Sequence, residues 1–420
     1  MDKFLVRGGA TLHGTVQISG AKNATLALMP AALLAAGTHR FANTPVLRDV
    51  TTMAMLLRTM GVRVELKDHT LTLDTSAVTS FEAPYEHVKK MRASIYVLGP
   101  LLARYGRARV SLPGGCAWGP RPVNLHLEGL RKLGAQIELE KGYIVARTDG
   151  LRGALVHFDV SSVGATGNIL MAAVLARGTT VIENAALEPE ITFLAETLQA
   201  MGATIDGIGT TRLEIQGAAE LRPAEIETIP DRIESGTFLV GAAITGGNVR
   251  LERTAPHHLG AILAKLEEAG CTINQGDDWV ALESPSRLAP VDVTAAVYPG
   301  FPTDMQAQWT ALMAIAGGSS LITDAIYPDR FKHVPELERL GADIEVRENA
   351  ALVRGVERLT GAKVMSTDLR GSASLILAGL VAEGTTEVLR VYHIDRGYEA
   401  IEKKLQLLGA DIERVAGEEF

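Results

Sequence analysis

One pattern of apolar and polar positions recurs six times along the chain. Each copy contains a stretch with apolar residues at steps of three and four, as at Ile191, Leu194 and Leu198, which predicts a helix with one buried face. A glycine then suits the left-handed residue that ends a helix, and the alternation of apolar and polar residues in 136–140 is typical of a strand. The glycines are Gly61, Gly134, Gly202, Gly270, Gly341 and Gly409, separated by 68–73 residues.

A second helix of a different kind precedes the amphipathic one in each copy. These segments are apolar or small on nearly every side, which indicates helices that are buried inside a large protein. A short strand separates the two helices, for example at residues 180–183. The predicted buried helices cover about residues 24–36, 94–103, 165–176, 236–244, 305–316 and 372–382.

Six copies in 420 residues are too many for one hydrophobic core, so three plus three is the natural division. Residues 221–230 lie halfway and contain two prolines, which suits a hinge. Strands within about residues 4–19 precede the first buried helix and could complete the second domain. We therefore predict an α/β fold of two inside-out barrel domains, each made of three copies with buried helices and outer sheets, and an active site in the cleft between them. The predicted domains are residues 22–229, with the Cys116 loop, and residues 1–21 plus 230–420.

Composition is that of an ordinary globular protein. Hydrophobic residues make up 47% of the chain and charged residues 21%, which excludes disorder as the main state. The net charge of −8 argues against nucleic acid and anionic lipid as partners. The apolar runs, of about 13 residues, are too short to cross a bilayer, and no signal peptide is evident. We expect a cytoplasmic protein with no membrane insertion and no obligate protein partner.

The starts of the buried helices carry candidate binding chemistry. Helix N-termini have free N–H groups and a partial positive charge, so they attract anions. Lys22, Arg92 and Arg370 lie at such starts and would strengthen an anion site, although a cation there is unfavourable to the helix itself. The alternative is that these three are solvated surface residues. The six starts are expected near Lys22, Arg92, Gly164, Glu234, Asp304 and Arg370.

Two further residues could carry chemistry. Residues 112–122 are rich in Gly and Pro, which predicts a loop, and they hold Cys116 five residues before Arg121. A neighbouring cation makes a thiol a better proton donor or nucleophile, whereas the alternative is a small buried residue. We favour that second interpretation for Cys271, which follows a helix-ending glycine; two cysteines also cannot form a four-thiolate zinc site. Asp304 follows a Pro-rich loop at a helix start, as either an N-cap or a base facing the cleft.

Several segments of the chain resemble the UDP-N-acetylglucosamine enolpyruvyl transferases, and the resemblance covers essentially all 420 residues. The family's fold of two inside-out domains agrees with the repeat pattern. The resemblance implies transfer of enolpyruvyl from phosphoenolpyruvate to the 3-hydroxyl of UDP-N-acetylglucosamine with release of phosphate, the first committed step of peptidoglycan synthesis, with no metal or organic cofactor. The segments are residues 19–24, 91–94, 113–116, 121–123, 302–308, 368–370 and 392–398.

The resemblance also implies which residues act on phosphoenolpyruvate. Lys22, Arg121 and Arg396 would hold this substrate. Cys116 would protonate its methylene carbon and can form a covalent adduct, and Asp304 would take the proton of the sugar hydroxyl. This division of labour is chemically sensible, because addition to an enol ether needs an acid at one carbon and a base at the attacking hydroxyl. The predicted catalytic residues are therefore Lys22, Cys116, Asp304 and Arg396.

Further residues are implied for binding and charge balance. Arg92 would lie near the same anion, and Arg330 and Arg370 would support closure and charge balance. The UDP-sugar would be bound by Asn23, Arg121, Pro122, Val123, Asn124, Leu125, Ser162, Val163, Gly164, Asp304 and Ile326.

The chain departs from the family pattern at two places. Val160 stands where the family often has Lys, and residues 117–120 read Ala-Trp-Gly-Pro where Thr-Ile-Gly-Ala is common. Two alternatives stay open: the shikimate-pathway enolpyruvyl transferase of the same fold, and a non-catalytic homologue that binds the nucleotide sugar. Cys116 argues against the first, which typically lacks the loop thiol. The joint presence of the four predicted catalytic residues argues against the second.

Overall fold

The computed structural model describes residues 2–89, 91–112 and 123–416. The chain forms two compact units. One unit, here the continuous unit, consists of residues 20–229. The other, here the discontinuous unit, combines the residues before Gly20 with those after Ile229.

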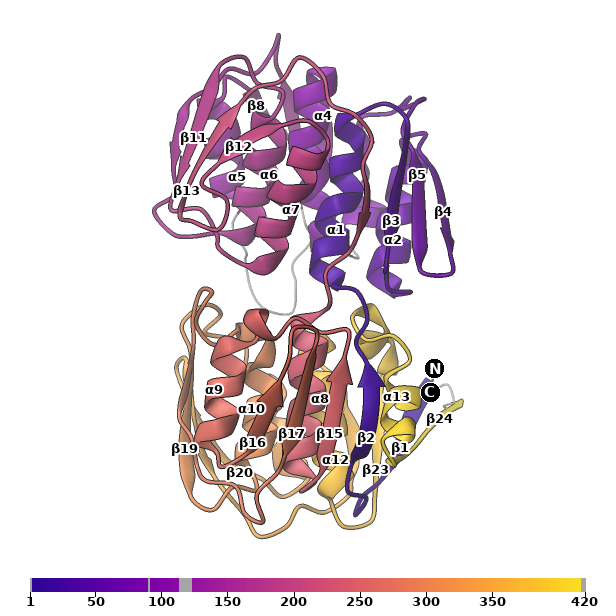
Figure 1. The fold of residues 1–420 in the computed structure, drawn as a ribbon, viewed down its shortest axis with the longest axis vertical. Helices are drawn as coiled ribbons and strands as arrows, with labels where there is room; N and C mark the ends of the chain where they lie inside the picture. The colour runs from indigo at the N-terminus through magenta and orange to yellow at the C-terminus, as the bar shows by residue number, and fades with distance from the viewer. Residues whose placement is uncertain (1, 90, 113–122, 417–420) are drawn as a thin grey trace. The chain divides into compact units, whose positions relative to one another are not determined.

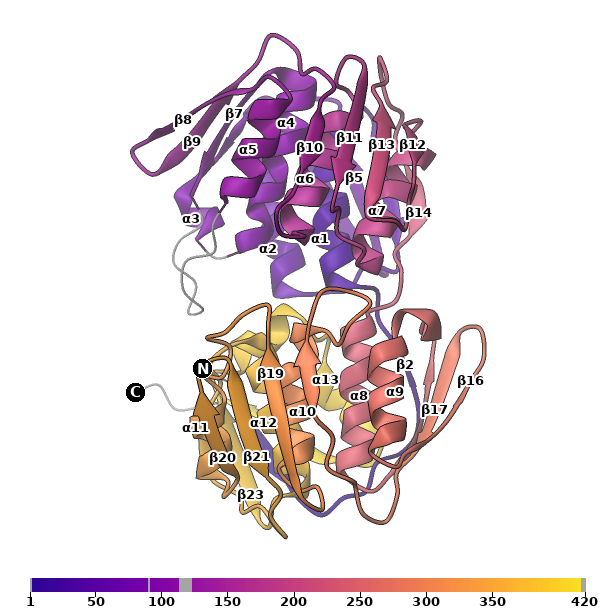
Figure 2. The ribbon, with the colours of Figure 1, turned by 90° about the vertical axis from the view of Figure 1, so that its left-hand side faces the viewer.

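Helices fill the interior of each unit and begin close to the predicted residues (Figures 1 and 2). In α12, every residue except Val381 is buried. None of the helices in the described part of the chain has the length and apolar character needed to span a bilayer. The buried helices are α1 (Lys22–Ala31), η2 and α4 (Arg92–Val97, Leu98–Tyr105), α6 (Val163–Ala173), α8 (Arg232–Ile244), η4 and α10 (Thr303–Met305, Gln306–Met313) and α12 (Leu369–Val381).

An amphipathic helix ends just before each of the six repeated glycines, as the periodicity predicts. All six glycines have φ between 92° and 107°, the left-handed conformation that closes a helix with least strain when no Cβ is present. These helices are α2 (Arg48–Thr59), α5 (Asn124–Lys132), α7 (Pro189–Ala200), α9 (Gly260–Glu268), α11 (Val334–Arg339) and α13 (Ile401–Leu407). Shorter helical segments are η1 (Ala32–Leu34), α3 (Tyr85–Val88), η3 (Pro256–His258) and η5 (Val391–Arg396).

The described residues form six four-stranded sheets of one design, with a parallel pair at one edge followed by two antiparallel pairings. The repetition, with helices inside and sheets outside, confirms the predicted fold class. In the continuous unit the sheets are β14 (Glu225–Glu227), β3 (Thr38–Ala42), β5 (Thr70–Asp74), β4 (Arg63–Lys67); β6 (Glu82–Ala83), β7 (Arg107–Ser111), β9 (Tyr143–Arg147), β8 (Gln136–Glu140); and β10 (Leu155–His157), β11 (Thr179–Glu183), β13 (Arg212–Gln216), β12 (Thr204–Asp206).

The discontinuous unit takes its first two strands from the N-terminus. β1 pairs antiparallel with both β23 and β24, and β2 pairs parallel with β15, beside which its indigo ribbon lies in Figure 1. Its sheets are β2 (His13–Gln17), β15 (Asn248–Glu252), β17 (Trp279–Glu283), β16 (Thr272–Gln275); β18 (Val293–Ala295), β19 (Ser319–Asp324), β21 (Ala350–Arg354), β20 (Asp343–Arg347); and β22 (Lys363–Met365), β23 (Thr385–Leu389), β1 (Asp2–Arg7), β24 (Asp411–Ala416).

Residues 221–230 are more structured than a hinge alone. They contain β14, which pairs parallel with β3 and places Ile226 opposite Phe41. Because β1 and β2 complete sheets of the discontinuous unit, the first sheet of the continuous unit takes its parallel edge strand from this segment instead. The prolines mark its ends, and the strand lies between them.

Each unit has its own hydrophobic core, and one core side chain bears directly on the predicted base. Trp309 of α10 is fully buried, and its indole N–H donates to the carbonyl of Val291 at 3.2 Å. Its ring meets that of Phe301 edge-on, with 5.4 Å between centroids. Phe301 and Trp309 lie on either side of Asp304 in the sequence, so their contact anchors the loop and the helix that carry this carboxylate.

Candidate active site

In the discontinuous unit, the carboxylate of Asp304 lies between two arginines. Its Oδ2 accepts from Arg370 Nη2 at 2.9 Å and from Arg370 Nε at 3.2 Å, and its Oδ1 is 2.8 Å from Arg330 Nη2. The side chain of Arg370 is only 2% exposed, whereas that of Asp304 is 26% exposed. The cations therefore lie beneath a carboxylate that still reaches solvent.

These contacts bear on the two predicted roles of Asp304. The N-cap of η4 is Pro302, and the structure gives this short helix no side-chain cap. Capping in this unit is done elsewhere: Asp231 accepts from two N–H groups at the start of α8, and Asp368 accepts from Arg370 N and Gly371 N at the start of α12. The ion pairs with arginine therefore favour a site residue over a helix cap.

A buried carboxylate that sequence reasoning missed organises the surroundings of Asp304. Asp324, at the end of β19, accepts from the hydroxyl of Thr303 at 2.7 Å and from the N–H of Ile326 at 2.9 Å. Thr303 Oγ1 in turn accepts from Arg330 Nη1 at 2.9 Å. Three predicted site residues, Asp304, Arg330 and Ile326, are thus connected through Thr303 and Asp324. A carboxylate that ends an apolar strand was the signal that could have identified Asp324.

Arg396, the remaining predicted residue of this unit, ends η5 and is half-buried. The helix η5 packs against α12, which carries Arg370. The discontinuous unit therefore brings Asp304, Arg330 and Arg370 into direct contact and places Arg396 on the element beside them.

In the continuous unit, Lys22 is the first residue of α1 and is almost entirely buried. Its Nζ lies 3.6 Å from a carboxylate oxygen of Asp49, which is in the first turn of α2. Asp49 offsets the unfavourable placement of a cation at a helix N-terminus. The interpretation of Lys22 and Arg370 as solvated surface residues is wrong, because both side chains are buried.

Arg92, at the start of η2, lies near a buried histidine that the sequence did not single out. Burial, and to a lesser extent the charge of Arg92, lower the pKa of His126 to about 4. The Nδ1 atom of His126 is 3.0 Å from the amide nitrogen of Asn168, whose oxygen accepts from Gly99 N at 2.7 Å. Because the amide nitrogen can only donate, Nδ1 is the acceptor and Nε2 carries the proton.

Because His126 is neutral in the folded state, the free energy of unfolding depends on pH. Its pKa of about 4 lies below the ordinary 6.5, so the unfolded chain binds more protons between these values and stability falls as the pH falls through that range. Between pH 7 and pH 5 the free energy of unfolding of wild type should fall by about 2 kcal/mol more than that of His126→Gln, as measured by urea unfolding at both pH values. His13→Gln, at an exposed position of β2, is the control and should track wild type. Equal acid sensitivity of His126→Gln and wild type would contradict this account.

The residues predicted for the UDP-sugar in this unit lie at helix starts. Ser162 is the N-cap of α6 and accepts from Ala165 N at 3.3 Å, with Val163 next to it. Gly164 follows, and a Cβ there would come within 3.1 Å of the His126 ring, so glycine permits this close approach. The departure at Val160 is a side chain that is 67% exposed. Asn23 is the second residue of α1, Val123 is the N-cap of α5, and Asn124 and Leu125 begin that helix.

Three predicted residues, Cys116, Arg121 and Pro122, lie outside the described residues, as does most of the predicted loop. The other thiol is Cys271, which is buried directly before β16. Burial raises its pKa to about 11, so it stays protonated and unreactive near neutral pH. This confirms the prediction that Cys271 is a small core residue.

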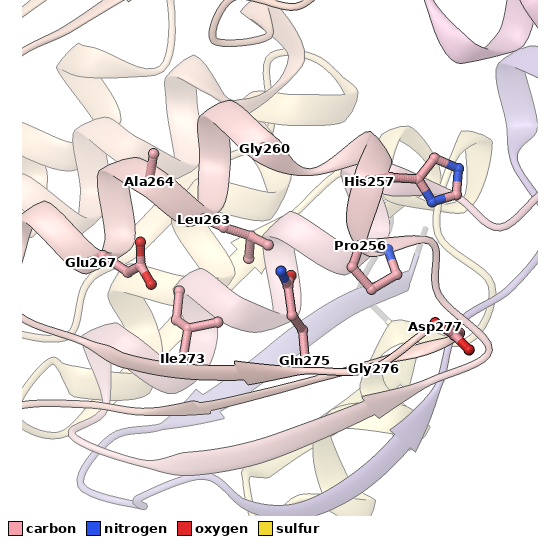
Figure 3. A pocket seen from close by; sticks show the side chains of 10 residues that line it. All are labelled: Pro256, His257, Gly260, Leu263, Ala264, Glu267, Ile273, Gln275, Gly276 and Asp277. Atoms are coloured by element: carbon pink, nitrogen blue, oxygen red, sulfur yellow. The ribbon is translucent and has the colours of Figure 1, made fainter.

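A pocket of about 720 Å³ lies between α9 and the β16–β17 hairpin (Figure 3). Its lining combines Leu263 and Ile273 with Glu267 and Asp277. No predicted site residue lines it, and acidic groups are poorly suited to an anionic substrate. The candidate residues are therefore the two sets described above, one in each unit, and not those of this pocket.

Comparison with known proteins covers the whole chain. The family model for EPSP synthase (3-phosphoshikimate 1-carboxyvinyltransferase) matches residues 6–405. The UDP-N-acetylglucosamine 1-carboxyvinyltransferase of Chloroherpeton thalassium is 60% identical over 423 aligned positions, which span 100% of this chain and 99% of the relative. The protein of the same name from Chlorobium chlorochromatii is 58% identical, with 100% of both chains aligned.

Solved structures agree on the fold. The enolpyruvyl transferase NikO from Streptomyces tendae superposes with a TM-score of 0.90 at 27% identity, covering 99% of each chain. An EPSP synthase from Acinetobacter baumannii superposes with a TM-score of 0.76 at 21% identity, covering 99% of this chain and 100% of that one. The second likeness supports the fold alone.

Proposed function

Because the chain belongs to the enolpyruvyl transferase family, in the group of the UDP-N-acetylglucosamine 1-carboxyvinyltransferases, we propose that it transfers enolpyruvyl from phosphoenolpyruvate to the 3-hydroxyl of UDP-N-acetylglucosamine and releases phosphate. The observation that carries this proposal is identity of 56–60% along the full chain to relatives of that name. We also propose that this reaction is the first committed step of peptidoglycan synthesis and that it takes place in the cytoplasm.

The charges of the site suit these substrates. Phosphoenolpyruvate and a nucleoside diphosphate sugar together bring several negative charges, which positioned cations must offset. Lys22 and Arg92 would supply such cations in the continuous unit, and Arg330, Arg370 and Arg396 would supply them in the discontinuous unit. Buried helix starts add the partial charges of their N–H groups. The cations of each unit would therefore suit an anion, although the whole chain has a net charge of −8.

The proposed chemistry is addition followed by elimination. The sugar 3-oxygen bonds to the central carbon of phosphoenolpyruvate while Asp304 takes the hydroxyl proton, and Cys116 gives a proton to the methylene carbon, which becomes a methyl group. The carbon–oxygen bond to phosphate then breaks, with its electron pair leaving on phosphate. The methyl group gives a proton back to the Cys116 thiolate, and the double bond re-forms. The partly exposed carboxylate of Asp304 supports this role, because a base must reach its substrate.

A phosphate-release assay tests the function. We expect turnover that requires both phosphoenolpyruvate and UDP-N-acetylglucosamine, with the enolpyruvyl sugar nucleotide found by mass spectrometry. Shikimate 3-phosphate should not replace the sugar nucleotide. Turnover with shikimate 3-phosphate would favour the sister enzyme instead, and binding of the sugar nucleotide without turnover would favour a non-catalytic homologue.

The acid role of Cys116 makes a prediction about its reactivity. An epoxide phosphonate such as fosfomycin should alkylate one thiol per chain at neutral pH, and Cys116→Ser should abolish this adduct. Cys271→Ser should keep it, because burial holds the Cys271 thiol protonated. Intact-mass measurement and peptide mapping check both variants. An adduct that persists in Cys116→Ser would show that the wrong thiol was chosen.

A further inference from the structure

Behind Asp304 and Arg370 lies a buried tyrosine that the proposed chemistry does not use. Tyr398 is 2% exposed, and the guanidinium of Arg370 lies over its ring, 5.3 Å from the ring centre. Its hydroxyl is 2.8 Å from Thr237 Oγ1 of α8 and 3.2 Å from Gln308 Nε2 of α10. One phenol therefore contacts side chains from three buried helices.

The donors and acceptors in this cluster can be assigned. Thr237 donates its hydrogen to the carbonyl of Ile233 at 2.7 Å, so the hydroxyl of Tyr398 must donate to Thr237. Burial raises the pKa of Tyr398, which keeps that hydrogen in place. Gln308 Nε2 donates to the main-chain carbonyl of Asp304 at 3.0 Å and also lies within reach of Tyr398 and Thr237. Among the described residues, Gln308 Oε1 has no hydrogen-bond partner, so the amide is oriented by its donor side.

The cluster holds both halves of the ion pair. Through Gln308 the hydroxyl of Tyr398 reaches the main chain of Asp304, and through its ring it supports the charge of Arg370. A cation over an aromatic face is stabilised most where water is excluded, as it is here. A phenylalanine would fill the same core volume, so packing alone gives no reason for a buried hydroxyl that must be hydrogen-bonded.

We propose that Tyr398 is a positioning residue for the reaction, which fixes Asp304 and Arg370 in their mutual geometry through Thr237, Gln308 and the face of its ring. This inference rests on the proposed function, because it concerns the step in which Asp304 takes a proton. Tyr398 acts through other side chains and is not itself assigned any contact with substrate.

The test is kinetic and uses the full chain. Tyr398→Phe keeps the ring and removes the hydroxyl; it should lower kcat about tenfold, the effect of one buried hydrogen bond, and leave both KM values within about twofold. The acid limb of its kcat–pH profile should move to higher pH, because a carboxylate held less closely by a cation takes up its proton more readily. A merely structural role would not move that limb.

Three further variants make the outcome decisive. Tyr105→Phe removes a hydroxyl that has no hydrogen-bond partner among the described residues, and it should behave as wild type. Thr237→Val should reproduce the loss seen in Tyr398→Phe, and Thr237→Ser should restore activity. These two also decide the question if Tyr398→Phe does not fold. A Tyr398→Phe enzyme with the kcat and pH profile of Tyr105→Phe would overturn the inference, whereas a wild-type protein without turnover would overturn the proposed function itself.

Discussion

An Asp304→Asn variant is expected to lose about 10²- to 10⁴-fold in kcat, the usual contribution of a positioned acid or base. Asparagine has nearly the same shape and can still accept a hydrogen bond from Arg330 or Arg370, but it cannot take up a proton. The substitution therefore removes proton uptake and keeps one of the two arginine contacts, because an amide has a single acceptor oxygen. The dissociation constant for UDP-N-acetylglucosamine, measured by calorimetry, should stay within about tenfold of wild type. Only one hydrogen bond, from the sugar hydroxyl, changes from a charged to a neutral acceptor.

A matched control guards against a general effect of removing a carboxylate. Asp343 is also paired with an arginine, Arg354, at 3.1 Å, but both side chains are exposed on the sheet surface. Asp343→Asn should leave kcat unchanged. An Asp304→Asn enzyme that keeps more than about a tenth of the wild-type rate, well above the range for a lost base, would refute the base assignment. Asp304 would then serve only as an anchor for Arg330 and Arg370.

A Lys404→Met variant is expected to lower the free energy of unfolding by about 3–5 kcal/mol, because it leaves a buried carboxylate without its cation. Lys404 Nζ donates to Glu234 Oε1 and to Ser19 Oγ, both at 2.7 Å, and the Glu234 side chain is only 3% exposed. Methionine keeps the apolar stem and removes only the charge. Urea unfolding at pH 8 measures the effect.

The matched control for Lys404 is an exposed ion pair of the same length. Lys265→Met breaks a 2.7 Å contact with Glu268 on the surface of α9, and it should cost less than about 1 kcal/mol. The loss in Lys404→Met should also shrink as the pH is lowered. Burial raises the pKa of Glu234, with Lys404 opposing the shift, so the unpaired carboxyl binds a proton more readily in the folded state and its penalty is smallest in acid. A loss equal to that of Lys265→Met would contradict the assigned importance of this pair.

The periodic features of the fold could be predicted from the sequence because they are local. A glycine with positive φ after an amphipathic helix leaves its mark within one copy of the repeat, and Gly61 and Gly409 show the same conformation in the first and last copies. The buried helices also begin within about two residues of the predicted starts, since apolar patterning marks them directly. The strand at Glu225–Glu227 was missed because its short sequence pairs with a distant edge.

The site divides in a similar way. Lys22, Asp304 and Arg370 could be found because they lie at helix starts, which are equivalent positions in successive copies of the repeat. Tyr398 could not, because its role comes from side chains on other copies of the repeat; it meets Thr237, which is 161 positions away. Asp324 contacts Thr303 within its own copy, and its one sequence signal was its place at the end of an apolar strand. Periodicity shows which face of an element is buried but not which polar groups meet there.

The placement of β1 in a sheet with β23 and β24 has a consequence for how the polypeptide is made. Residues 20–229 leave the ribosome as a complete unit and are free to fold early, whereas Phe4 must wait for its neighbours Val388 and Arg414. At about 5–20 residues per second, that delay is roughly 20–80 s. During translation the edges of β1 have no partner strand and are open to mispairing or to capture by a chaperone, so this sheet forms after the other strands of the chain have been made.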